Sequence, residues 1–180
     1  MRKILFVFGV LNDGDVDWMV RAGTRRVIGV GDILIQEGTA FPSIVLLLSG
    51  NMVVSVSGIG EVAKLAAGDF IGEMSLVDSA PPSATVIAAT ACTALFLDKQ
   101  KLQRKLADDV AFASRFYRAL AILLSDRLRA TEKRMAYGEH QGLDDESVRL
   151  RDELDVGVLD QVSMAGDRFD RLLKRVAASA

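Results

Sequence analysis

The stretch Gly68–Val86, GDFIGEMSLVDSAPPSATV, contains the densest set of structural signals in the chain. Its glycines mark sharp backbone turns, and the consecutive prolines Pro81 and Pro82 interrupt regular structure. No lysine or arginine lies between Lys64 and Lys99, so the stretch has no positive side chain of its own. An anion bound here would depend on backbone N–H groups, hydroxyl groups or a cation from elsewhere in the chain.

The segments around this stretch predict a β-structure between Thr24 and Asp98. Short apolar or alternating runs are separated by glycines, which is typical of a sandwich or barrel. Periodicity alone does not choose between these two. Cys92 is expected to be a buried residue of the last strand. The expected strands are Val27–Val30, Ile33–Gln36, Ile44–Leu48, Met52–Val56, Val62–Leu65, Thr85–Ala88 and Ala94–Leu97.

Four motifs in this region follow the order and spacing of a known family. They are GDILIQEG (Gly31–Gly38), LLLSG (Leu46–Gly50), LAAGDFIGEMSL (Leu65–Leu76) and SATVIA (Ser83–Ala88). With them the chain resembles the cyclic nucleotide-binding domains of catabolite activator proteins, kinase regulatory subunits and gated channels. The resemblance implies an α+β fold, a jelly-roll-like β-roll (double-stranded β-helix) flanked by an N-terminal helix and long C-terminal helices.

The same resemblance identifies Gly68–Val86 as the phosphate-binding cassette of that family. It implies that Glu73 accepts a hydrogen bond from a ribose hydroxyl and that a short helix beginning near Glu73 directs N–H groups at a phosphate. In the family an arginine pairs with the cyclic phosphate, whereas this chain has Pro82 at that place. The implied ligand-binding residues are Val54, Val62, Leu65, Ile71, Gly72, Glu73, Met74, Ser75, Pro82, Ser83, Ala84 and Thr85.

Pro82 leaves three interpretations open. Losing a hydrogen bond to a charged group forfeits about 1.5–3 kcal/mol, roughly tenfold to over a hundredfold in affinity. The domain is then a scaffold without a bound cofactor, a genuine cyclic AMP or cyclic GMP sensor that tolerates the loss, or a sensor of another small molecule. A later helix would have to supply any replacement cation, for example Arg115 or Arg118. We favour a regulatory protein with a degenerate cassette, acting by dimerisation and contact with a partner protein.

Helices are predicted on both sides of the β-structure. Asn12 or Asp13 is expected to cap one that runs to about Ala22, and Asp98 to cap a short one over Lys99–Leu106. A longer helix, Asp108–Arg134, is apolar on more than one side. Its barrel-facing residues would be Phe112, Phe116, Leu120 and Leu123. A second stripe of Ala113, Tyr117, Leu120, Leu124 and Leu128 predicts a homodimer, as the resemblance implies, or cover by the folded-back tail.

The expected organisation is a domain over residues 1–134, an acidic linker over 135–155 and a helical tail over 156–180. The tail predicts one or two short helices broken near Gly166. About 40 residues after the long helix are too few for a winged DNA-binding module, so a transcription regulator is the third alternative and nucleic-acid binding is not expected. The tail's basic residues that could face phosphates are Arg168, Arg171, Lys174 and Arg175.

Composition restricts the function further. The net charge of −2 gives no global attraction to nucleic acid, and a single cysteine fits a reducing compartment. The apolar run Ile4–Leu11 is far shorter than a membrane span, which favours a cytoplasmic protein. No Ser-His-Asp set, Cys-His pair or phosphate-binding loop is recognisable, and His140 has no second histidine for a metal, so we expect no enzyme and no metal site.

Overall fold

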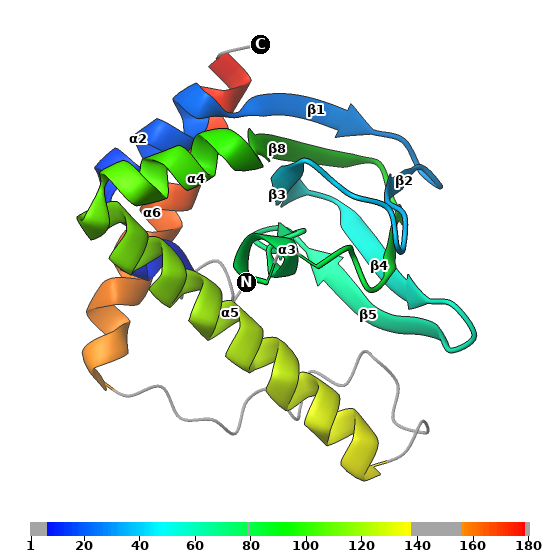
Figure 1. The fold of residues 1–180 in the computed structure, drawn as a ribbon. Helices are drawn as coiled ribbons and strands as arrows, with labels where there is room; N and C mark the ends of the chain where they lie inside the picture. Colours follow the sequence, from blue (N-terminus) through cyan, green and yellow to red (C-terminus); the bar gives the residue numbers. More distant parts are fainter. Residues whose placement is uncertain (1–6, 79, 138–155, 179–180) are drawn as a thin grey trace.

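The computed structural model describes residues 7–78, 80–137 and 156–178. Its strands are β1 (Thr24–Ile28), β2 (Ile33–Ile35), β3 (Ser43–Ser49), β4 (Asn51–Val56), β5 (Gly60–Ala66), β6 (Phe70–Ile71), β7 (Thr85–Ala88) and β8 (Cys92–Asp98). Its helices are α2 (Asp13–Ala22), α3 (Met74–Val77), α4 (Lys99–Asp108), α5 (Val110–Tyr137) and α6 (Val156–Ala178). The strands form two antiparallel four-stranded sheets, ordered β1-β8-β3-β6 and β2-β7-β4-β5. The predicted β-roll with flanking helices is therefore confirmed, and Figure 1 shows α2, α4, α5 and α6 gathered on one side of it.

Two strands differ from the sequence prediction by more than two residues at an end. The first was expected over Val27–Val30, but β1 begins at Thr24 and pairs with β8 in a register that joins Thr24 to Phe96. Threonine and two arginines start this exposed edge strand, so no apolar alternation reveals it. Strand β6 was not predicted because two residues are too short for a pattern, and its pairing with β3 defines it.

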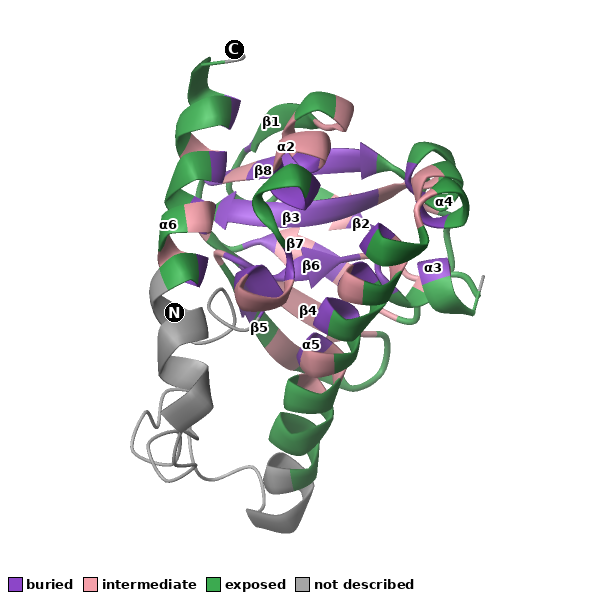
Figure 2. Ribbon diagram, turned by 90° about the vertical axis from the view of Figure 1, so that its left-hand side faces the viewer, coloured by how far each residue is buried: buried purple, intermediate pink, exposed green. Residues whose placement is uncertain are grey.

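The core has two parts, separated by the sheet that contains β3 and β8. Residues of β3 alternate between them, so that Ile44, Leu46 and Leu48 face the helices while Val45 and Leu47 face the second sheet. Cys92 is buried between the sheets, as predicted. Figure 2 shows the largely buried strands β3 and β8 running behind the helical layer.

Caps confirm the predicted helix starts. The Asn12 side chain accepts from the Asp15 N–H at 2.9 Å, and Asp15 accepts from the Asn12 N–H at 2.8 Å, which forms a capping box for α2. Asp98 accepts from the Lys101 N–H at the start of α4. The long helix α5 begins after Asp109 and continues to Tyr137, three residues beyond the predicted Arg134.

The prediction of one or two short helices broken near Gly166 is wrong. The tail forms one continuous helix, α6. A glycine inside a helix costs only about 1 kcal/mol, which burial of one helix face outweighs. Phe169 packs edge-to-face on Phe8 with ring centroids 5.1 Å apart, and α6 lies against α2. The tail therefore covers α2 and the segment that contains Phe8, while Tyr117 and Leu128 of α5 stay exposed. The predicted linker's residues 138–155, including His140, lie outside the described residues.

Candidate functional site

The cassette is a tight connection from β6 into the four-residue helix α3. Gly72 has φ +80°, and a Cβ there would lie 3.1 Å from the Ser43 carbonyl oxygen and 3.3 Å from the Phe41 ring. Only glycine fits both the conformation and the space. The turn places Glu73 at the N-cap of α3 without a side-chain capping bond, and its side chain is only 3% exposed. A buried carboxylate at this position requires a partner.

That partner is Arg127 of α5. One terminal nitrogen of its guanidinium binds Glu73 Oε1, and the other donates to the Phe70 carbonyl oxygen at 2.6 Å. The second nitrogen also lies 3.6 Å from Asp69 Oδ1, and the Asp69 side chain is 1% exposed. A helix that follows the β-roll in sequence therefore supplies the cation at the cassette.

A second cation approaches the cassette from the start of α4. Lys99 Nζ donates to the Phe41 carbonyl oxygen at 2.7 Å and to Ser75 Oγ, which itself donates to the Gly72 carbonyl oxygen at 3.0 Å. Burial lowers the pKa of the Lys99 ammonium, and the nearby Glu73 carboxylate opposes that shift. Two carboxylates, those of Asp69 and Glu73, thus lie close to two cations.

The return segment after α3 is held by its backbone. The Pro82 carbonyl oxygen accepts from the Gly38 N–H at 2.8 Å, so the position expected to hold arginine is fixed to the loop after β2. Thr85 Oγ1 accepts from the Glu37 N–H at 3.1 Å. A shallow cavity beside it is lined by Gln36, Glu37, Gly38, Ser55, Ser57, Thr85 and Ile87.

The other residues implied by the resemblance fall into three groups. Leu65 and Ile71 are buried between the sheets, with Val54 packed against them. Val62, Ala84 and Ser75 are half-buried. Met74 and Ser83 are exposed.

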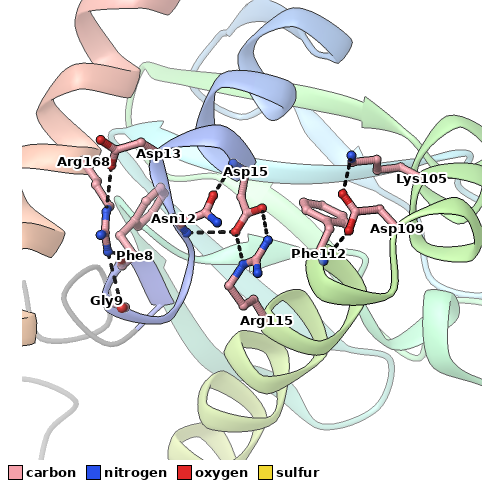
Figure 3. Close-up of polar contacts among 10 residues, drawn as sticks. All are labelled: Phe8, Gly9, Asn12, Asp13, Asp15, Lys105, Asp109, Phe112, Arg115 and Arg168. Carbon is pink, nitrogen blue, oxygen red and sulfur yellow. Dashed lines mark hydrogen bonds and ion pairs between the residues drawn. The ribbon is translucent and has the colours of Figure 1, made fainter.

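Arg115 and Arg118 do not supply the cassette cation. Arg115 forms a bidentate pair with Asp15 of α2, with N–O distances of 2.6 and 2.8 Å (Figure 3), and Arg118 is exposed. Arg127 was not singled out from the sequence, although a signal exists. It comes four residues after Leu123 and so continues the buried stripe of α5. An arginine in such a stripe indicates a buried acidic partner.

Three basic residues of α6 pair with acidic residues of α2. Arg168 and Arg171 both pair with Asp13, at 2.9 and 2.5 Å, and Arg175 pairs with Asp17. Arg168 also donates to the Phe8 carbonyl oxygen (Figure 3). Hydrogen bonds from the two arginines lower the pKa of Asp13. Three of the four side chains considered for phosphate contacts thus have partners within the chain.

Two features are absent from the part of the chain that the structure describes. None of its helices combines the length and hydropathy needed to cross a membrane. No group of three or more His, Cys, Asp or Glu residues there is arranged to hold a metal ion.

Residues 25–109 match the family model described as cyclic nucleotide-binding domain. A cAMP-dependent protein kinase regulatory subunit of Yarrowia lipolytica is 38% identical over 84 residues, which are 46% of this chain and 22% of the relative. The chain thus spans about a fifth of that relative's length. A cyclic nucleotide-binding domain of Methylobacillus flagellatus superposes with a TM-score of 0.67 at 24% identity, covering 79% of this chain and 85% of the other. The catabolite activator protein of Thermus thermophilus has a TM-score of 0.59 at 23% identity, covering 97% and 87%. Both structural likenesses are under 25% identical and show the fold alone, and the family match identifies residues 25–109, just under half of the chain, as similar to cyclic nucleotide-binding domains.

Proposed function

We propose that this chain is a non-enzymatic, cytoplasmic regulatory protein whose cassette is closed by its own helix α5 rather than by a nucleotide. One observation carries the proposal. The Glu73 carboxylate, which the family resemblance assigns to a ribose hydroxyl, already binds the Arg127 guanidinium. A nucleotide would have to displace a charge-assisted contact of the protein to reach Glu73.

The charges of the cassette also disfavour a phosphate. Asp69 and Glu73 balance Arg127 and Lys99, so these four groups offer no net positive charge to an anion. Pro82 contributes neither a cation nor an N–H. Backbone N–H groups and the exposed Ser83 hydroxyl would remain as donors, each worth about half of an arginine contact.

We assign regulation to contacts made by the helical layer. Tyr117 is 46% exposed and Leu128 60% exposed, and they lie on the stripe of α5 that the sequence predicts as a dimer surface. A second copy of this chain, or a partner protein, would remove these side chains from water. Each fully buried leucine contributes about 1.5–3 kcal/mol to such an association.

The alternative is a genuine sensor of cyclic AMP or cyclic GMP. It is supported by the family match and by the relatives named as cAMP-dependent kinase regulatory subunits. Lys99, whose ammonium binds Ser75 on α3, is the cation that would compensate for the missing arginine in that case.

Calorimetric titration with cyclic AMP and cyclic GMP separates the two functions. We expect no heat of micromolar binding from the unmodified protein. Pro82→Arg restores the family's cation, and Pro81→Arg, with the same charge one residue earlier, is the matched control. If the unmodified protein binds either nucleotide with micromolar affinity and Lys99→Met abolishes that binding, the protein is a sensor and not a scaffold.

Analytical ultracentrifugation tests the dimer. Leu128→Glu places a charge in the exposed stripe and is expected to give monomers. Ala130→Glu, on a different side of the same exposed turn, is expected to leave the association unchanged. A monomeric unmodified protein at micromolar concentration would refute dimerisation through α5.

A further inference from the structure

The cassette presents acceptors instead of donors to α5. Three oxygen acceptors meet at one point: Glu73 Oε1, Asp69 Oδ1 and the Phe70 carbonyl oxygen. Both carboxylate side chains are almost completely buried, and burying an unpaired carboxylate is strongly unfavourable. This arrangement is complementary to a cation with several donors and repels a phosphate.

The shape of the acceptor set selects among cations. The two terminal nitrogens of Arg127 bind different residues, Glu73 on one side and Phe70 on the other. A planar guanidinium directs its donors in such a fork, whereas a compact ammonium does not. Lys99, the second cation nearby, contacts Ser75 and Phe41 instead, and it leaves the Glu73 oxygen to Arg127.

The contact also holds a specific part of the fold. Leu123 is the last buried apolar residue of α5 among those whose side chains are described. Arg127 follows one turn later, where neighbouring side chains are exposed, so the ion pair rather than apolar packing attaches this part of α5 to the β-roll.

We propose that the cassette of this chain is a guanidinium-binding site, with Arg127 as its occupant in cis. This assignment rests on the proposed function and deepens it, because it names the group that takes the nucleotide's place. The site binds alkylguanidinium cations whenever Arg127 is absent. Its occupation fixes the distal half of α5, and with it the exposed stripe around Leu128.

Chemical rescue of Arg127→Ala tests the site. The variant leaves Asp69 and Glu73 without their guanidinium, and we expect a lower melting temperature than for the unmodified protein. Millimolar methylguanidinium should restore part of the loss, whereas the same concentration of sodium chloride or methylammonium should not. Arg129→Ala, which removes an exposed arginine of the same helix, should neither lower the melting temperature comparably nor respond to methylguanidinium.

A double variant assigns the rescue to the cassette. Glu73→Gln with Arg127→Ala removes the carboxylate that binds the guanidinium directly and leaves Asp69, so it should recover part of the stability and lose the methylguanidinium response. If Arg127→Ala does not fold in buffer, its refolding yield in methylguanidinium against sodium chloride gives the same comparison. The proposal would be overturned if Arg127→Ala melted like Arg129→Ala, or if sodium chloride stabilised Arg127→Ala as much as methylguanidinium does. A methylguanidinium response that persists in the double variant would also overturn it. The nucleotide titration is independent, since a nucleotide-binding unmodified protein would end the proposed function and leave this rescue standing.

Discussion

The bidentate pair between Arg115 and Asp15 provides the sharpest test of how the N-terminal helix is fixed to α5. Asp15 is buried, with a side chain 5% exposed, and Arg115 is 31% exposed. Removing one partner of a buried pair costs about 3–5 kcal/mol. The exposure of Arg115 and the remaining bond from the Asn12 N–H reduce the loss, so we expect Arg115→Gln to lower the free energy of unfolding by about 2–3 kcal/mol.

Urea unfolding followed by circular dichroism measures this loss, and thermal melting should show a decrease of about 5–10 °C. Hydrogen bonding to Asp15 raises the pKa of Arg115, so the guanidinium stays charged at any working pH. Arg118→Gln, on an exposed side of the same helix, is the matched control and should change stability by about 0.5 kcal/mol or less. An Arg115→Gln variant as stable as Arg118→Gln would refute the buried pair and the position it gives α2 against α5.

Three further predictions concern the fold around the site. Phe169→Ala removes the ring packed on Phe8 and should cost about 3–5 kcal/mol, measured by urea unfolding, with loss of α6 helicity. The lowered pKa of Asp13 means that its ion pairs stabilise the protein above about pH 4 and are lost as the pH falls through the folded-state pKa. At neutral pH, Asp13→Asn should therefore lower the free energy of unfolding by less than about 1 kcal/mol, because the carboxylate is half-exposed, and thermal melts at low pH should show no difference. Gly50→Ala should be severely destabilising in thermal melts, because the added Cβ would lie 2.5 Å from the Ala91 carbonyl oxygen.

Local patterns were sufficient for most of the fold. Glycine turns with apolar or alternating runs predicted β2, β3, β4, β5, β7 and β8, and β7 has the predicted bounds. Side-chain caps at Asn12 and Asp98 placed the helix starts, because a capping bond involves residues only three positions apart. The exceptions, β1 and β6, are strands whose identity depends on the neighbour they pair with.

The site depended on contacts that no local pattern contains. Through the family resemblance, the sequence predicted a phosphate-binding cassette over Gly68–Val86 with Pro82 in place of its arginine. It did not place Arg127 on Glu73, because those residues are 54 positions apart and meet only through the packing direction of α5. The same holds for Arg168 and Asp13, which are 155 positions apart.

By itself, then, the sequence determined a β-roll of the cyclic nucleotide-binding type, since turns, alternation and motif spacing are properties of neighbouring residues, whereas Pro82 in place of the family's arginine stays a prediction from the resemblance. Only the tertiary structure decided which group binds the Glu73 carboxylate and where the tail lies. Both outcomes follow from long-range burial: a carboxylate enclosed at the start of α3 requires a cation, and the path of α5 brings Arg127 to it.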